Sequence, residues 1–318
     1  MSSRRIAVVA IGSTSVHLTV ARVSDRELRR IADESVLFEL GPTVDALGRV
    51  PSDRLDGLLR ELELYAKGAA RMHAGALTIV ATEPLRRASN ARAVVDAVRT
   101  ATSGAVHVLG HDEEALLSLH AVLGGRPPHA DTLVVDIGGG SSEYAIAGPG
   151  RVPVVDVVRT GAARLTDAFV RADPPAPEEF AAAREAARSA LARTVEAAPG
   201  AAIMVGGTAT NLLRLVAGTA PWRSLTRARL EEAVRILGQL SIGEITTRYP
   251  IRPQRARILP GGAALAWAFL ERYRLRSATV SQASIREGLI LAIARAGDDW
   301  RERLPELVGG PPGPGARG

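Results

Sequence analysis

The chain has 318 residues, no cysteine and a formal net charge of +6. This length favours two domains, since one domain commonly spans roughly 100–200 residues. The lack of cysteine excludes disulfides, thiolate metal sites and cysteine nucleophiles. No apolar run approaches the roughly 20 residues that a membrane-spanning helix needs, so we expect a cytoplasmic protein without a membrane partner.

The first half of the chain begins with a predicted β-hairpin over residues 5–23, in which Val16, Leu18 and Val20 alternate as in a half-buried strand. After it, hydrophobic periodicity and capping residues predict a helix over 52–75, a strand over 76–81, a helix from about 90 to 100, a strand over 106–109 and a helix over 113–123. The Gly-Gly-Arg-Pro-Pro stretch at 124–128 is typical of a linker and marks the expected domain boundary.

The second half is expected to follow the same alternation. The predicted elements are a hairpin over 133–147, a strand over 152–158, helices over 163–169 and 177–198, a strand over 202–205, a helix over 208–215 and a final helix, strand and helix over 262–273, 278–281 and 285–295. We therefore expect domains at residues 1–125 and 126–308. The Pro/Gly-rich tail at 309–318 is expected to be disordered.

The hairpin at 133–147 combines two apolar runs with a glycine-rich bend and two carboxylates. Glycines at 138–140 allow close approach of the backbone, so that successive N–H groups can point at one anion. Asp136 and Glu143 flank this bend, where a divalent cation on a bound phosphate would lie. One such bend could be an ordinary surface turn. However, residues 8–15 align without a gap on residues 134–141. This internal repeat predicts two related domains that face one cleft.

Other residues also favour a phosphate ligand. The Gly206-Gly207 junction between a predicted strand and helix places N–H groups at a helix N-terminus. Lys67 is the single lysine among 40 basic residues, so a Gly-Lys-Ser/Thr phosphate loop is excluded. Phosphate would then be held by backbone N–H groups, hydroxyls, arginines or a metal. Nucleic acid is not expected, because aromatic residues make up only 3% of the chain and offer few stacking platforms.

Six further motifs occur beside the two hairpins, at residues 81–90, 110–115, 160–166, 205–210, 255–262 and 280–288. Together they resemble the exopolyphosphatase/guanosine pentaphosphate phosphatase family, a branch of the actin, sugar-kinase and heat-shock ATPase superfamily. The resemblance covers about residues 5–295. It implies an α/β fold of two ribonuclease-H-like (actin-like ATPase) domains flanking a cleft.

The resemblance also implies a reaction, in which a metal-assisted water hydrolyses the terminal phosphoanhydride of inorganic polyphosphate or of guanosine pentaphosphate, a nucleotide of the stringent response. It makes Glu114 the catalytic carboxylate, and Asp136 and Glu143 the ligands of Mg²⁺ or Mn²⁺. The phosphate-binding residues that it implies are Gly12, Ser13, Thr14, Ser15, Arg86, Gly138, Gly139, Gly140, Ser141, Gly207 and Thr208. By residue type alone, Glu114 could equally be a solvated acid in the first turn of a helix.

One departure from the family pattern favours an alternative function. Members usually carry aspartate where this chain has Ala10, which stands opposite Asp136 in the repeat, and Thr14 replaces the usual asparagine. A protein that binds polyphosphate or guanosine penta- or tetraphosphate without hydrolysing it is therefore an alternative, and a homodimer is left open. A histidine–aspartate phosphohydrolase at His111 and Asp112, or a sugar or acyl kinase, fits the motifs less well.

Overall fold

The computed structural model describes residues 4–24, 27–75, 77–126, 128–217 and 223–309. The expected Pro/Gly tail lies outside these ranges from residue 310 onward. The chain divides into two compact units. Unit 1 contains residues 1–125 and 285–307, and unit 2 contains residues 126–284 and 308–318. No helix in the described ranges is both long enough and apolar enough to cross a bilayer.

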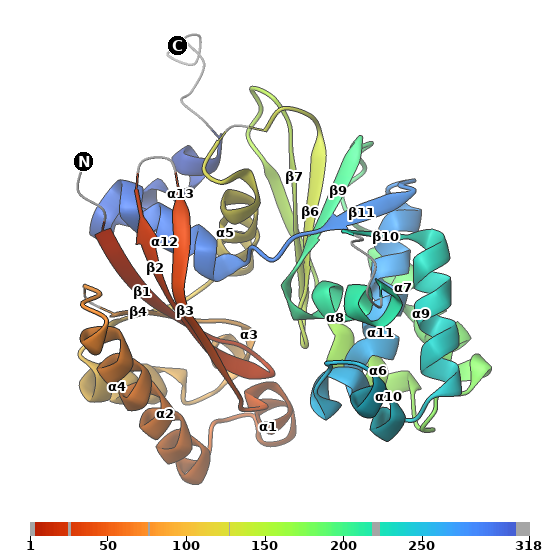
Figure 1. Cartoon of the computed structure of the whole chain (residues 1–318), viewed down its shortest axis with the longest axis horizontal. Coiled ribbons are helices and arrows are strands. Elements are labelled where there is room, and N and C mark those ends of the chain that lie inside the picture. The colour runs from red at the N-terminus through yellow and green to blue at the C-terminus, as the bar shows by residue number, and fades with distance from the viewer. Residues whose placement is uncertain (1–3, 25–26, 76, 127, 218–222, 310–318) are drawn as a thin grey trace. The chain divides into compact units, whose positions relative to one another are not determined.

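Unit 1 is built on a five-stranded sheet with the strand order β3-β2-β1-β4-β5 (Figure 1). Its strands are β1 (Arg4–Ile11), β2 (Ser15–Val23), β3 (Leu28–Leu37), β4 (Leu77–Ala81) and β5 (Ala105–Val108). The first three strands pair antiparallel, whereas β4 and β5 run parallel to β1. Its helices are α1 (Leu40–Leu47), α2 (Ser52–Arg71), α3 (Glu83–Arg87), α4 (Ala91–Thr102), α5 (His111–Leu123), α12 (Ile285–Ala296), the 3₁₀ turn at Gly297–Asp299 and α13 (Trp300–Gly309), the last two residues of which belong to unit 2.

Helices cover both faces of this sheet. Along β1, the side chains of Val9 and Ile11 belong to the core that α2 completes with Leu58 and Leu62, which are spaced one helical turn apart. Because successive strand residues point to opposite faces, Ala10 and its neighbours of even number point to the other face. Helix α12 packs there against β1 and β2. A nearly continuous apolar strand such as β1 is therefore expected, since both of its faces are buried.

The expected second domain at 126–308 differs from the observed division, because residues 285–307 belong to unit 1. Helix α12 lies so close to α5 that a Cβ atom on Gly288 would be 2.0 Å from the carbonyl oxygen of Leu117. Two ion pairs add to this packing: Arg286 binds Asp33 of β3, and Glu287 binds Arg30 of the same strand. The packing and the charge pairs place α12 with the first sheet.

Unit 2 repeats the topology of unit 1. Its strands are β6 (Thr132–Ile137), β7 (Ser142–Ala147), β8 (Val154–Val158), β9 (Ala201–Val205), β10 (Ser224–Thr226) and β11 (Ser277–Val280). In the order β8-β7-β6-β9-β11, the strands run in the same relative directions as the strands of the first sheet. Strand β10 pairs antiparallel with β11 at the edge of the sheet. The two units are thus related in topology, as the repeat predicts, and have the ribonuclease-H-like fold that the family resemblance implies.

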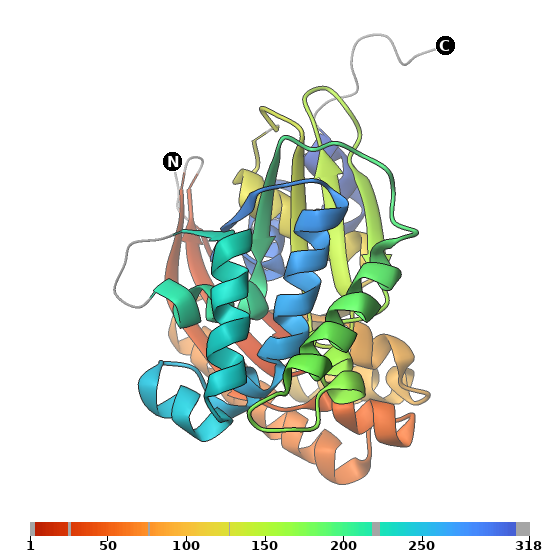
Figure 2. The same ribbon diagram turned by 90° about the vertical axis from the view of Figure 1, so that its right-hand side faces the viewer.

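One buried helix organises the core of unit 2. The helices of this unit are α6 (Ala162–Phe169), α7 (Pro177–Leu191), α8 (Gly206–Ala217), α9 (Arg227–Gln239), α10 (Ile242–Arg248) and α11 (Pro253–Arg272). Figure 2 shows α11 between α7 and α9, and it also contacts α6 and α8. Gly261 permits the close approach to α6, because a Cβ atom there would lie 2.4 Å from the carbonyl oxygen of Ala162.

Candidate active site

The loop at residues 12–15 joins β1 to β2 in unit 1. The N–H of Gly12 donates to the carbonyl of Ser15 at 3.0 Å, which closes the bend. The carbonyl of Ser13 accepts from Gly41 N–H at 2.8 Å, and the carbonyl of Thr14 accepts from Phe38 N–H at 3.0 Å. A Cβ atom on Gly41 would come within 2.9 Å of the Ser13 Cβ. The backbone before α1 and in its first turn therefore fixes the loop that we expect to bind phosphate.

The loop at residues 138–141 has the same bend in unit 2, with Gly138 N–H donating to the carbonyl of Ser141 at 3.0 Å. The carbonyl of Gly138 accepts from Ala162 N–H at 2.8 Å, and the guanidinium of Arg164 donates to the carbonyl of Gly140 at 3.0 Å. Residues of helix α6 therefore donate hydrogen bonds to the carbonyl oxygens of this loop. A loop held in this way can present its N–H groups to an anion at no further cost in backbone entropy.

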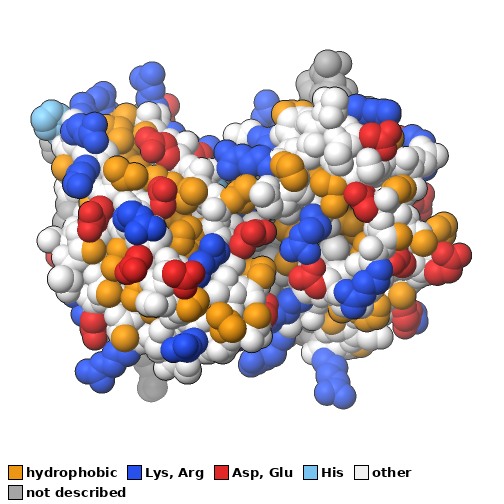
Figure 3. Space-filling view, turned by 90° about the horizontal axis from the view of Figure 1, so that it is seen from below, with side chains coloured by type: hydrophobic (Ala, Val, Ile, Leu, Met, Phe, Trp, Pro, Cys, Tyr) orange, Lys and Arg blue, Asp and Glu red, His pale blue; other side chains and the backbone are white. Residues whose placement is uncertain are grey.

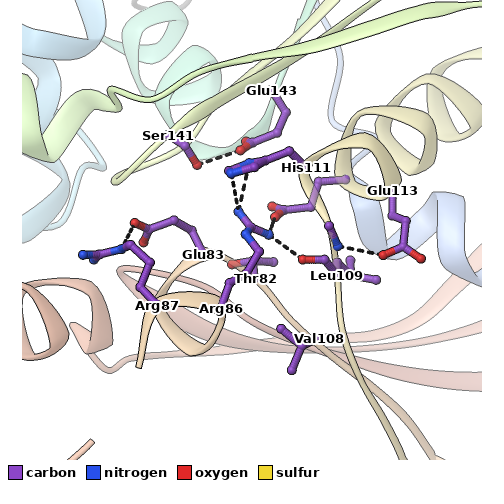
Figure 4. Close-up of polar contacts among 12 residues, drawn as sticks. Thr82, Glu83, Arg86, Arg87, Val108, Leu109, His111, Glu113, Ser141 and Glu143 are labelled. Atoms are coloured by element: carbon purple, nitrogen blue, oxygen red, sulfur yellow. Dashed lines mark hydrogen bonds and ion pairs between the residues drawn. The ribbon is translucent and has the colours of Figure 1, made fainter. Parts of the chain in front are cut away.

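Asp136 and Glu143 are directly opposite each other on β6 and β7. Directly opposed antiparallel residues have Cβ atoms about 5 Å apart, so their carboxylates can reach one cation. The Oγ of Ser141 donates to Glu143 Oε1 at 2.6 Å, which orients that carboxylate (Figure 4). Asp136 packs on Gly206, where a Cβ atom would lie 2.4 Å from its Oδ1. Two oriented carboxylates are hard oxygen donors that fit Mg²⁺ or Mn²⁺.

The third expected phosphate loop lies at the start of α8, directly after β9 in unit 2. Gly206 has a φ of 81°, a conformation that favours glycine. The hydroxyl of Thr208 donates to the carbonyl of Ile137 at 2.7 Å, so this side chain supports the end of β6. Arg255 of α11 lies against Gly207, within 3.2 Å of the position that a Cβ atom would take there. Burial and the charge of Arg252 lower the pKa of Arg255, whereas Asp136 acts in the opposite direction.

Glu114 lies in the first turn of α5, in unit 1, and only 8% of it is exposed. Its Oε1 accepts from Arg86 Nη1 at 2.5 Å. The same guanidinium donates to the carbonyl of Leu109 and lies 2.9 Å from His111 Nδ1 (Figure 4). Two predicted site residues are therefore brought together, since Arg86 orients the Glu114 carboxylate at the start of α5.

The neighbouring Glu113 has a structural function. It accepts from Gly110 N–H at 2.7 Å and so caps the N-terminus of α5, and Arg301 Nη2 donates to it at 2.8 Å. Burial alone would raise the pKa of the Glu113 carboxyl, but the hydrogen bonds from Arg301 and Gly110 leave this pKa below its usual value. The two adjacent glutamates thus have different environments, and only Glu114 is bound to Arg86.

Two further polar residues, Glu83 and His17, lie beside the glycine-rich loop of unit 1, and no sequence motif pointed to them as site residues. Glu83 is 5% exposed, accepts from Ser13 Oγ at 3.3 Å and forms an ion pair with Arg87 (Figure 4). His17 lies opposite Ala10 on the hairpin of unit 1, and its Nε2 is 2.6 Å from Ser15 Oγ. If the repeat is extended by two residues, it pairs His17 with Glu143. This longer alignment of the internal repeat is the sequence feature that could have drawn attention to His17.

Two arginines from the matched motifs are paired inside their own units. Arg257 binds Asp167 at 2.5 Å, and Arg286 binds Asp33 at 2.5 Å and Thr19 Oγ1 at 2.7 Å. On the face drawn in Figure 3, basic and acidic side chains are interspersed rather than gathered by sign. On this face, therefore, no region of one charge sign marks a binding site.

The model of the Ppx/GppA phosphatase family matches residues 19–296 of this chain. Exopolyphosphatase 2 of Mycobacterium tuberculosis (strain ATCC 25618 / H37Rv) is 30% identical over 320 residues, which cover 92% of this chain and all of that protein. The crystal structure of the Aquifex aeolicus member of the family has a TM-score of 0.82 and 27% identity, with 93% of this chain and 99% of that chain covered. A structure described as an exopolyphosphatase from Cytophaga hutchinsonii shares the fold, with a TM-score of 0.81 at 20% identity and 92% and 98% coverage.

Proposed function

Because the chain belongs to the Ppx/GppA phosphatase family, a family of phosphohydrolases, we propose that it removes the terminal phosphate from inorganic polyphosphate. The observation that carries the proposal is the buried Glu114, which Arg86 orients at the start of α5. A second supporting feature is the pair of glycine-rich hairpin loops, one in each unit, with the same internal hydrogen bond.

In the proposed reaction, the Glu114 carboxylate accepts a proton from a water molecule as the water oxygen attacks the terminal phosphorus. The bridging P–O bond breaks, the shortened chain leaves with the electron pair of that bond, and inorganic phosphate is released. A carboxylate suits this step because the water must be both oriented and deprotonated. Arg86, which the family resemblance makes a phosphate-binding residue, would also act as a positioning residue, since its guanidinium holds the Glu114 carboxylate through Nη1.

The hairpin loops supply the proposed phosphate contacts. The backbone N–H groups of residues 13–15 in unit 1, and those of residues 139–141 in unit 2, would each bind phosphate oxygens. The start of α8 and Arg255 would bind a phosphate farther along the chain. These groups are fixed before substrate arrives, which is what electrostatic stabilisation of a phosphoryl transition state requires.

Asp136 and Glu143 are the residues that would hold a divalent cation, which we propose to be Mg²⁺ or Mn²⁺. When bound, such a cation neutralises charge on the phosphate oxygens. We also propose that guanosine pentaphosphate is a second substrate, that guanosine tetraphosphate and a second copy of the chain are candidate partners, and that the protein acts in the cytoplasm.

A phosphate-release assay tests this function. Polyphosphate and guanosine pentaphosphate are each supplied with Mg²⁺, with Mn²⁺ and with a chelator. We expect metal-dependent release from polyphosphate, with orthophosphate as the product. Release from neither substrate with either metal would contradict the proposed hydrolysis.

Ala10 is the specific observation that favours a second candidate function, a regulatory protein that binds polyphosphate or guanosine penta- or tetraphosphate without turnover. A methyl group offers no ligand atom, so the hairpin of unit 1 lacks the carboxylate found at Asp136 of unit 2. Saturable binding of polyphosphate, together with no phosphate release at any metal concentration, would support this second function over the first.

A further inference from the structure

The two glycine-rich loops begin with the same peptide group, the one that joins an isoleucine to the first glycine. It joins Ile11 to Gly12 in unit 1 and Ile137 to Gly138 in unit 2. In each loop the N–H of this group donates across the bend at 3.0 Å, to the carbonyl three residues farther on. Because a peptide group is planar, the torsions on its two sides decide where the N–H groups of the next residues point.

A buried threonine holds the carbonyl side of each of these peptide groups. The hydroxyl of Thr82 donates to the carbonyl of Ile11 at 3.2 Å, and that of Thr208 donates to the carbonyl of Ile137 at 2.7 Å. In unit 1 the backbone N–H of Thr82 adds a second bond to the same carbonyl, at 3.1 Å. Only 8% of Thr82 and 3% of Thr208 is exposed. Each threonine lies 71 residues after the isoleucine that it binds, so the two occupy equivalent positions in the internal repeat.

The bond that Thr208 makes leaves its hydroxyl unable to donate to phosphate. A threonine hydroxyl has one hydrogen, and an unprotonated phosphate oxygen can only accept. In Thr208 this hydrogen is given to the carbonyl of Ile137. The methyl group of Thr208 packs so closely against α11 that a Cβ atom on Gly262 would lie 2.4 Å from it, which restricts rotation of the side chain. The side chain of Thr208 is therefore arranged to hold the end of β6 rather than to contact a ligand.

We infer that Thr82 and Thr208 are equivalent positioning residues, each of which fixes the first peptide group of its glycine-rich loop while its side chain does not touch the substrate. The N–H groups of residues 13–15 and 139–141 are thereby held in the directions in which they meet phosphate. The inference rests on the proposed phosphate function of the two loops. It gives the side chain of Thr208 a role that acts through the loop, where the family resemblance implies a phosphate contact.

Hydrogen exchange, measured by NMR on the full-length protein without substrate, tests whether the hydroxyl holds the loop. Thr208→Val replaces the hydroxyl by a methyl group of similar size. We expect the Gly138 amide to exchange about 10-fold faster, while the amides of β6 and of Gly12 keep their wild-type protection. Thr82→Val should speed the exchange of Gly12 alone, and by less, because the Thr82 N–H still holds the carbonyl. Thr102→Val is the matched control, since the hydroxyl of Thr102 donates within its own helix.

Titration calorimetry with tripolyphosphate and Mg²⁺ tests whether the held loop matters for binding. Thr208→Val should bind about 10-fold more weakly than wild type, the size of one lost hydrogen bond, and Thr208→Ser, which keeps the hydroxyl, should recover most of the affinity. Weaker binding with unchanged exchange of Gly138 would show a direct phosphate contact and overturn the inference, as would unchanged affinity in Thr208→Val. Wild type that binds tripolyphosphate but releases no phosphate from polyphosphate would contradict the proposed hydrolysis alone.

Discussion

Unit 1 should lose less of its free energy of unfolding at low pH when His120 is replaced by leucine. His120 lies on α5 and is 0% exposed, and neither ring nitrogen has a hydrogen-bond partner among the described residues. Burial, and then the positive charge of Arg295, lower the pKa of His120 to about 4 from the usual 6.5. The folded protein therefore keeps this imidazole neutral at a pH where the unfolded chain has already bound a proton.

The sign and the size follow from proton linkage. Above pH 6.5 both states are neutral at His120, so this residue adds no pH dependence. Below pH 6.5 the unfolded state gains the proton first, and stability is lost until the folded state is also protonated near pH 4. At about 1.4 kcal/mol for each pKa unit, the loss between pH 7 and pH 5 is about 2 kcal/mol, and the full loss by pH 4 is about 3 kcal/mol.

The measurement is urea unfolding of wild type and His120→Leu at pH 7 and pH 5, with hydrogen exchange of the α5 amides identifying the transition of unit 1. Glu113 and His107 also titrate, but they are present in both proteins, so the difference between the two isolates His120. We expect the variant to lose about 2 kcal/mol less than wild type over this range. His129→Leu, at an exposed position, serves as the control. Equal losses in wild type and His120→Leu would refute the assigned pKa.

Three further predictions concern packing, capping and charge. Gly288→Ala should destabilise unit 1 by about 1–3 kcal/mol, because its Cβ would lie 2.0 Å from the Leu117 carbonyl oxygen; an unchanged urea midpoint would contradict this packing. Glu113→Gln should lower the melting temperature while turnover per folded molecule stays constant, and a large fall in turnover would give Glu113 a role in catalysis. Polyphosphate affinity should fall steeply between low and high ionic strength in a calorimetric titration, and undetectable binding at low salt would contradict a polyanion site.

Patterns within short stretches of the sequence predicted those elements of the fold that form from neighbouring residues. The two hairpins, the helix from Ser52 and the strand–Gly-Gly–helix junction were all predicted, because apolar periodicity and glycine placement lie within short windows. Strand β3 was missed, since its alternation is obscured by charged residues on an exposed edge strand. The segment between α8 and residue 262 was also left unassigned, although β10, α9, α10 and the first turns of α11 occupy it.

Non-local contacts explain the other differences. The assignment of α12 to unit 1 depends on its packing against α5 and on the Arg286–Asp33 pair, whose two residues are 253 positions apart in the sequence. Glu83 could not be predicted as a neighbour of Ser13 for the same reason. Glu114 and Arg86 were named from motifs, but their mutual ion pair emerged only from the fold. Their roles in catalysis stay predictions.

The most direct test of the proposed hydrolysis is the rate of phosphate release from polyphosphate by wild type, Glu114→Gln and Glu113→Gln, each with Mg²⁺ and each corrected for the folded fraction. If Glu114 is the general base, Glu114→Gln should lower turnover by a factor of roughly 10²–10⁴, while polyphosphate affinity and the turnover of Glu113→Gln stay close to wild type. Equal turnover in wild type and Glu114→Gln would contradict the account.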